Sequence, residues 1–194
     1  MTPSVHRLGV LGGAFDPPHN AHVALAQAAV QQLQLDRLLV FPTGVAWHKD
    51  QTLTEAVHRV AMAQLAFGGL DRVVVDDRET RRPGPTYTID TLRDLAGQYQ
   101  GSTLFLLLGA DQARALPQWH QGDLISQFAI ICVADRGEVQ APLDARFTPV
   151  RMAPTSVSSS RIRELLAAGQ DADALVPQSI ARYIAQHHLY QNPR

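Results

Sequence analysis

Short, almost continuously apolar runs, separated by segments with a helical pattern, constrain this chain more than any other feature of its sequence. A short unbroken apolar run is typical of a strand that is buried on both faces, as in a parallel sheet. Alternation of such strands with helices predicts a doubly wound α/β sheet, which binds ligands beyond the carboxyl ends of its strands. We expect strands at residues 5–11, 37–41, 72–75, 103–108 and 128–133, and helices at 21–33, 54–66, 88–98, 160–168 and 178–187.

Length and composition narrow the class of protein. The chain has 194 residues, of which 45% are hydrophobic and 18% charged, and this suits one globular domain over residues 1–194. The net charge is −1 at pH 7, so nucleic-acid binding is not expected, and the one cysteine, Cys132, excludes an intrachain disulfide. No apolar run approaches the ~20 residues that span a membrane, and no secretory pattern opens the chain. We therefore expect a cytoplasmic location without membrane attachment, and a homo-oligomer is left open.

The stretch 9–22, GVLGGAFDPPHNAH, joins the first expected strand to the first expected helix. Its glycines allow a ligand to approach the backbone without a Cβ in the way, and Asn20 is the expected N-cap. His19 and His22 then lie at a helix N-terminus, where N–H groups and the helix dipole favour anions. The combination predicts a phosphate site, whereas each part alone also fits a plain turn, two surface histidines or a metal pair. The metal pair is disfavoured because no Cys, Glu or third His follows at ligand spacing.

The segment GGAFDPPHNAH is similar to the GG(T/S)FDPxHxGH signature of the nucleotidyltransferase superfamily, a relative of the HIGH motif of class I aminoacyl-tRNA synthetases. Ala14 replaces the usual Thr or Ser, and Ala21 replaces the usual Gly, and neither change removes an ionisable group. The resemblance implies a Rossmann-like fold that binds ATP. It also implies that His19 and His22 are catalytic and that ATP contacts Gly12, Gly13, Ala14, Phe15, Asp16, His19 and His22.

A second anion site is predicted at the start of a later helix, in the C-terminal helical part 158–194. Serines of SSSRIR can cap this helix, but the helix dipole disfavours the two arginines of its first turn by ~0.3–1 kcal/mol each. A bound polyanion would reverse the sign of that effect. The segment VSSSRIR resembles the ISSTxIR motif of the superfamily, which implies that Ser158, Ser159, Ser160 and Arg163 bind ATP phosphates.

Two further segments resemble the nicotinate-nucleotide adenylyltransferases in particular. PTYTIDTL, at 85–92, is similar to the family's S/T-Y-T-x-D-T-L stretch, whose helix start holds the pyridine carboxylate. From Gly109 to Trp119 the sequence matches G-x-D-x-x-x-x-L-x-x-W, and the tryptophan offers an aromatic face to a flat ring. From the residues alone, ordinary helix caps explain both segments as well. By resemblance, Gly109 and Asp111 contact ATP, and Thr86, Tyr87 and Trp119 contact the acceptor.

The loop PTGVAWHK resembles the family's P-x-x-x-P-x-H-K loop, with Ala46 and Trp47 in place of the usual prolines. His48 and Lys49 can reach a phosphate or a carboxylate, although a solvated loop explains them equally well. Arg136 lies just after the fifth expected strand and takes the place of a family arginine that contacts the mononucleotide. The resemblance thus implies that His48, Lys49 and Arg136 bind the acceptor.

Together the residues and the resemblance predict adenylyl transfer from ATP to nicotinate mononucleotide, with release of pyrophosphate. Mg²⁺ is expected to bind mainly through the ATP phosphates. Neither a Walker A pattern nor G-x-G-x-x-G is present. The alternatives are a different acceptor (nicotinamide mononucleotide, phosphopantetheine or FMN) and a nucleotide sensor without catalysis. The charged residues of the motifs argue against the sensor, and Trp119 argues for a flat aromatic acceptor.

Overall fold

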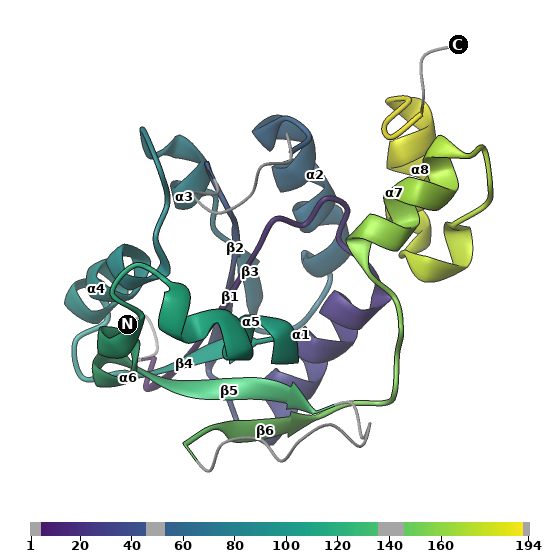
Figure 1. Cartoon of the computed structure of the whole chain (residues 1–194). Helices are drawn as coiled ribbons and strands as arrows, with labels where there is room; N and C mark the ends of the chain where they lie inside the picture. The colour runs from purple at the N-terminus through teal and green to yellow at the C-terminus, as the bar shows by residue number, and fades with distance from the viewer. Residues whose placement is uncertain (1–4, 46–52, 136–145, 192–194) are drawn as a thin grey trace.

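The computed structural model describes residues 5–45, 53–135 and 146–191. Within them, six parallel strands form one sheet in the order β3-β2-β1-β4-β5-β6, so that the strand order reverses between β1 and β4 (Figure 1). Doubly wound sheets bind ligands at such a switch point. The strands are β1 (Arg7–Gly13), β2 (Arg37–Pro42), β3 (Val73–Val75), β4 (Thr103–Leu108), β5 (Ala129–Asp135) and β6 (Thr148–Arg151).

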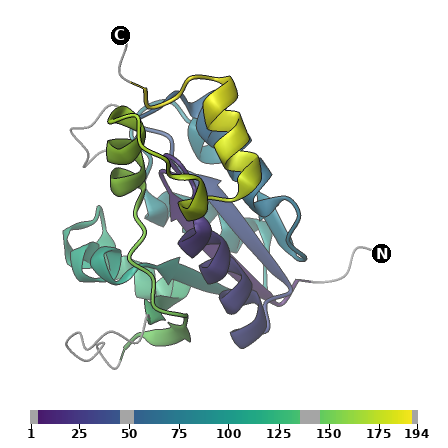
Figure 2. The ribbon, with the colours of Figure 1, turned by 90° about the vertical axis from the view of Figure 1, so that its right-hand side faces the viewer.

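Helices cover both faces of the sheet. α1, α2, α7 and α8 pack on one face, and α4 and α5 pack on the other; Figure 2 looks onto the face that carries α1. Among the described residues, every helix is too short or too polar for a bilayer crossing. The helices are α1 (Asn20–Gln32), α2 (Ala56–Phe67), α3 (Arg78–Arg81), α4 (Thr88–Gln98), α5 (Ala110–Ala115), α6 (Ile125–Phe128), α7 (Ser159–Ala167) and α8 (Gln178–Gln186), with 3₁₀ turns η1 (Leu116–Gln118), η2 (Gly122–Leu124) and η3 (Asp173–Leu175).

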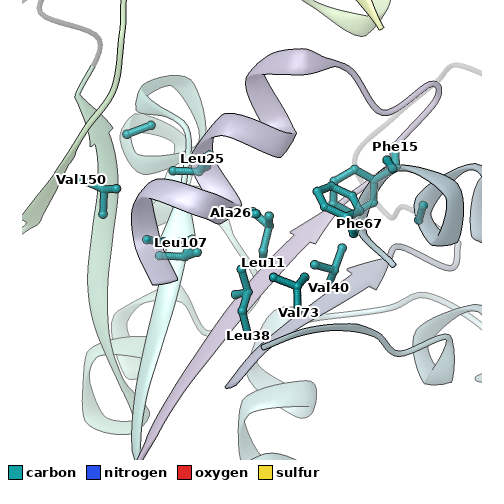
Figure 3. Packing of buried hydrophobic residues seen from close by; sticks show 14 of the residues in the cluster. Leu11, Phe15, Leu25, Ala26, Leu38, Val40, Phe67, Val73, Leu107 and Val150 are labelled. Carbon is teal, nitrogen blue, oxygen red and sulfur yellow. The ribbon is translucent and has the colours of Figure 1, made fainter. Parts of the chain in front are cut away.

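Alternate residues of each strand enter two separate cores, because successive side chains point to opposite faces of the sheet. Leu11, Val40 and Leu107 pack with α1 and α2 on one face (Figure 3). Val10 and Leu106 pack with α4 on the other face. Burial on both faces explains why the strands read as continuous apolar runs.

The five predicted strands and the longer helices are confirmed, with ends shifted by a few residues. β6 was not predicted; it lies at the edge of the sheet, where its proline is tolerated. The predicted N-cap Asn20 is wrong. His19 is the N-cap of α1, because its carbonyl already accepts the N–H groups of His22 and Val23, and the Asn20 amide instead donates to the carbonyl of Ala174.

A close contact fixes the loop after β2 against the segment that contains α3. Val45 and Pro85 form a parallel bridge, and the Thr86 N–H donates to the Val45 carbonyl at 3.0 Å. Gly44 approaches so closely that a Cβ there would lie 2.2 Å from the carbonyl oxygen of Glu79. Backbone rather than a flexible side chain occupies that space, so only glycine fits without a shift.

Gly44→Ala is therefore expected to destabilise the protein by about 1–3 kcal/mol, the usual cost of overpacking. Gly97→Ala is the control, because a Cβ at this exposed position of α4 meets nothing within 4 Å. We expect it to stabilise the helix by about 0.5–1 kcal/mol. Urea unfolding of the two variants measures both effects, and equal stability of the two would contradict the contact described at Gly44.

Glu79 is a carboxylic acid buried beneath this contact. Only 6% of the residue is exposed, and its Oε1 accepts a hydrogen bond from the Thr91 hydroxyl at 2.7 Å. Thr91 in turn accepts from the Arg82 guanidinium at 3.0 Å. Burial raises the pKa of Glu79 from 4.5 to about 7, against the opposing effect of the Thr91 hydrogen bond. The folded protein therefore favours the neutral carboxyl in a pH range where the unfolded chain is ionised.

This shift makes stability depend on pH. The contribution of the neutral Glu79 carboxyl is complete below pH 4.5 and is lost as the pH rises through about 7. Glu79→Gln stays neutral and retains an acceptor for Thr91. At pH 8 we expect this variant to exceed the parent protein in unfolding free energy by on the order of 3 kcal/mol, at 1.4 kcal/mol per pKa unit, and by much less at pH 5. Urea unfolding at both pH values measures the difference, with the exposed Glu164→Gln as control; a difference that does not change with pH would contradict the burial effect.

Candidate active site

A cavity of about 660 Å³ opens at the carboxyl ends of β1 and β4, where the strand order reverses. Small-molecule sites commonly have volumes of about 300–1,000 Å³. The walls come from the loop after β1, the starts of α1, α4 and α7, and the turn around Trp119. The predicted site residues that line it are Gly12, Gly13, Ala14, Phe15, Asp16, His19, His22, Thr86, Tyr87, Gly109, Trp119, Ser159, Ser160 and Arg163.

Phe15 anchors residues 12–19, here called the signature loop, to the hydrophobic core. This residue is 1% exposed, and its ring meets Phe67 and His22 edge-on, with centroids 5.4 and 5.1 Å apart. Its φ of 48° is uncommon for a bulky residue and persists only where the surroundings hold it. A Cβ at Gly12, in contrast, would meet nothing within 4 Å. The loop is thus anchored on one side and leaves its backbone open to the cavity on the other.

His19 and His22 stack on each other at the start of α1, with ring centroids 3.7 Å apart and planes 20° apart. Nδ1 of His22 accepts the backbone N–H of His19 at 3.2 Å. While this bond lasts, Nδ1 carries no proton, so the ring N–H of His22 is on Nε2. His22 therefore presents its Nε2–H as the donor for a ligand in the cavity, which it lines.

The start of α7 is docked onto the signature loop. The Ser158 hydroxyl caps the helix by accepting the Arg161 N–H, as predicted for a serine at this place. The Ser159 hydroxyl donates to the Pro17 carbonyl at 2.9 Å, and Nη1 of Arg163 donates to the Asp16 carbonyl at 2.7 Å. The N-termini of α1 and α7 therefore face one cavity, and the unfavourable effect of the dipole on Arg163 is partly offset within the chain.

The side chain of Asp16 is held by donors of the protein itself. The residue is 2% exposed; Oδ1 accepts the Tyr190 hydroxyl at 2.6 Å, and Oδ2 accepts the Thr54 N–H at 3.1 Å. These contacts connect the signature loop with the segment before α2 and with the residues after α8. Contact of Asp16 with ATP stays a prediction, whereas its contacts within the protein are defined.

Arg59, on α2, was not predicted and joins the loops around the cavity. It is 3% exposed, and its guanidinium donates to the carbonyls of Ala14, Thr43 and Thr54 at 3.0, 2.7 and 2.8 Å. These groups belong to the loop after β1, the loop after β2 and the segment before α2. Burial lowers the pKa of Arg59, and the Asp16 carboxylate opposes that effect. The residue holds the loops at fixed separations.

The other end of the cavity is aromatic. The rings of Tyr87 and His120 lie 4.2 Å apart between centroids, and Trp119 lines the same end. Tyr87 is also the N-cap of α4 and makes no side-chain capping bond. Neither Thr86 nor Thr88 is therefore the N-cap, and the first turn of α4 begins at the cavity wall, where Thr88 lies.

Some predicted residues lie elsewhere. Asp111 and Ser158 are exposed and do not line the cavity; the Asp111 carboxylate pairs with Arg114 at 2.6 Å because α5 begins at Ala110 and points it outward. His48, Lys49 and Arg136 lie outside the described residues. The cavity is also lined by residues that were not predicted as site residues, among them Thr43, Leu53, Glu79, Gln112, His120 and Met152.

Sequence comparisons identify relatives over nearly the whole chain. Residues 10–165 match the family model described as Cytidylyltransferase-like. The Albidiferax ferrireducens protein named "Probable nicotinate-nucleotide adenylyltransferase" is 51% identical, over 95% of this chain and 98% of that protein. A Bordetella pertussis protein of the same name is 39% identical, over 96% of this chain and 99% of that protein.

Comparison of folds agrees with the sequence comparisons. The Plasmodium falciparum nicotinic acid mononucleotide adenylyltransferase complexed with NaAD superposes with a TM-score of 0.79, covering 95% of this chain and 97% of that one at 22% identity. This likeness confirms the predicted doubly wound fold. Because the family model spans most of the chain and the sequence relatives span nearly all of it, the chain belongs to the cytidylyltransferase-like family and, within it, to the nicotinate-nucleotide adenylyltransferases.

Proposed function

We propose that this chain transfers the adenylyl group of ATP to the phosphate of nicotinate mononucleotide, forming nicotinate adenine dinucleotide and pyrophosphate in NAD biosynthesis. The observation that carries the proposal is a single cavity with helix N-termini at one end and aromatic rings at the other. Helix N-termini bind phosphate groups, and aromatic rings stack on flat heterocycles. The names of the sequence relatives support the identity of the two nucleotides.

We assign the ATP phosphates to the space between the starts of α1 and α7. The donors there are the backbone N–H groups of both helix starts, the Ser160 hydroxyl and the Arg163 guanidinium. Gly12 leaves room for the nucleotide to approach the backbone. Ser158 contributes indirectly, because its cap fixes the first turn of α7. Contact of Asp111 with ATP stays a prediction, since its carboxylate pairs with Arg114 outside the cavity lining.

The proposed reaction needs alignment more than proton transfer. The acceptor phosphate is largely ionised at pH 7, since its second pKa is about 6. It attacks the α-phosphorus of ATP in line with the departing pyrophosphate, and negative charge spreads over the phosphoryl oxygens in the transition state. The Nε2–H of His22 and the two helix N-termini are already held in place by protein contacts, so they stabilise this charge with little reorganisation.

Mg²⁺ would fit this site with the ATP phosphate oxygens as its ligands. Within residues 5–45, 53–135 and 146–191, no three His, Cys, Asp or Glu side chains are grouped to hold a metal ion. Both oxygens of Asp16 already accept hydrogen bonds from the protein. Mg²⁺ usually keeps several waters and binds through substrate phosphates rather than in a protein cage. When bound, it neutralises charge on the departing pyrophosphate.

We assign the pyridine ring of the acceptor to the aromatic end, against Trp119 and Tyr87. The first turn of α4 lies at this end, and its N–H groups and dipole favour a carboxylate over a neutral amide. An amide would direct its NH₂ at other donors and leave buried polar groups unpaired, at a cost of about 1–3 kcal/mol. These features support nicotinate mononucleotide as the acceptor.

Pyrophosphate release from ATP tests the proposal, with nicotinate mononucleotide, nicotinamide mononucleotide, phosphopantetheine and FMN supplied in turn. We expect release and formation of the dinucleotide with the first acceptor. Release with none of the four would overturn adenylyl transfer, whereas a preference for phosphopantetheine or FMN would overturn the choice of acceptor.

His22→Ala is expected to lower kcat by about 10²–10³-fold, the usual loss when one transition-state donor is removed. The KM for ATP should change far less, because the charge that His22 stabilises develops in the transition state. Steady-state pyrophosphate release at varied ATP measures both constants. His6→Ala, at the opposite end of β1, is the control and should leave both unchanged. Near-normal turnover of the His22 variant would exclude the assigned role.

The enzyme is expected to prefer nicotinate mononucleotide to nicotinamide mononucleotide by about tenfold or more in kcat/KM, since each 1.4 kcal/mol of discrimination is one decade. Matched assays with the two acceptors measure this ratio. Trp119→Ala removes the stacking partner without touching α4. Because stacking does not depend on the substituent of the pyridine ring, we expect kcat/KM to fall by about the same factor for both acceptors. Equal efficiency of the parent enzyme with both acceptors would reject α4 as the selective element.

A further inference from the structure

The residues that follow α8 return to the signature loop. Tyr190 places its hydroxyl 2.6 Å from Oδ1 of Asp16, although the two residues are 174 positions apart in the sequence. Its ring packs against the core cluster that contains Phe15 and Phe67. The contact joins the C-terminal segment to the loop that carries His19 and the glycines.

The backbone around Tyr190 is unusual. His188 and Tyr190 have φ values of 51° and 64°, in the left-handed region that bulky residues rarely adopt. Such conformations persist where the surrounding contacts determine them, and they cluster near functional sites. Here they turn a short segment so that its tyrosine, and not its neighbours, reaches Asp16.

Asp16 connects Tyr190 to the end of the cavity between the starts of α1 and α7, where we assign the ATP phosphates. Its side chain is fixed by Tyr190 on one oxygen and by the Thr54 N–H on the other. Its backbone carbonyl accepts the Arg163 guanidinium at 2.7 Å. Asp16 therefore connects Tyr190 with Arg163 through its side chain on one side and its backbone on the other. Burial, together with the Asp16 carboxylate, raises the pKa of the Tyr190 hydroxyl, so the hydroxyl stays protonated and can donate its hydrogen bond.

We propose that Tyr190 is a positioning residue for triphosphate binding, acting through Asp16 on Arg163 and on the signature loop. Tyr190 is not among the residues that line the cavity. The identity of the ligand as ATP rests on the proposed function, whereas the contacts from Tyr190 to Arg163 do not. Because the aromatic end of the cavity lies on α4 and the Trp119 turn, loss of the Tyr190 hydroxyl affects triphosphate binding and leaves acceptor binding unchanged.

Tyr190→Phe removes only the hydroxyl. We expect kcat/KM for ATP to fall about tenfold, as small misplacements of binding groups commonly cause, with the KM for nicotinate mononucleotide unchanged within twofold. The affinity for inorganic tripolyphosphate, measured by isothermal titration calorimetry without acceptor, should fall by a similar factor. Tyr183→Phe is the matched control: it removes a hydroxyl that bonds His58 at 3.0 Å, away from the cavity, and should leave these constants unchanged.

The tripolyphosphate titration separates this proposal from the proposed function, because it requires no reaction. Weaker tripolyphosphate binding in Tyr190→Phe but not in Tyr183→Phe supports positioning even if another acceptor proves to be the substrate. Equal affinity in the parent protein and Tyr190→Phe overturns it, as does equal loss in both tyrosine variants or no binding by the parent protein.

Asp16→Asn supplies a second variant that changes the other partner of the same bond. If both residues act through one contact, the double variant Asp16→Asn/Tyr190→Phe should bind tripolyphosphate no more weakly than the weaker single variant. Additive losses would show that Tyr190 acts by another route and would overturn the proposal. The cycle is measured below the melting temperature of every variant, so that loss of folding does not enter the comparison.

Discussion

The shape of the cavity depends on the buried guanidinium of Arg59. It joins carbonyl groups of Ala14, Thr43 and Thr54, which belong to the loop after β1, the loop after β2 and the segment before α2. Loss of any acceptor would leave a buried charged donor unpaired, at a cost of at least about 1–3 kcal/mol, so these loops keep a single arrangement. Phe15 anchors the signature loop from the core side. The polar groups around the cavity are therefore held in position by the protein alone, which is the condition for electrostatic stabilisation of a transition state.

Most of the sheet could be predicted because burial on both faces leaves an unbroken apolar run at each central strand. β6 could not: of its four residues only Val150 is buried, and a proline interrupts the pattern. The helices α3 and α6 have only four residues each, which is too short for a helical repeat of apolar residues to be recognised in the sequence. The N-cap of α1 was misplaced by one residue: His19 has the extended backbone of an N-cap, with φ −141° and ψ 172°, and Asn20 is already the first helical residue.

The candidate site was predictable where its chemistry lies in short motifs at strand ends and helix starts. Contacts between distant segments carry no such signal. Arg59 reads as an ordinary solvent-facing residue of a helix, and Tyr190 lies far from Asp16 in sequence. Asp111 shows the reverse case: its loop reaches the cavity through Gly109, but the local direction of α5 turns the carboxylate toward Arg114. Motifs thus identify which loops form the site, and packing decides which side chains enter it.

The docking of α7 has a consequence for the order in which the protein matures during synthesis. Ser159 and Arg163 bond to carbonyls 142 and 147 residues earlier in the chain. While these residues are still inside the ribosome, β1, β2 and β4 can already pair, but the crevice above them has only one of its two helix N-termini. Contacts between such distant segments also form late, because closing a long loop lowers chain entropy before the contact compensates for it. A nascent chain is therefore expected to gain affinity for a triphosphate only after α7 has been synthesised and has docked on the loop after β1.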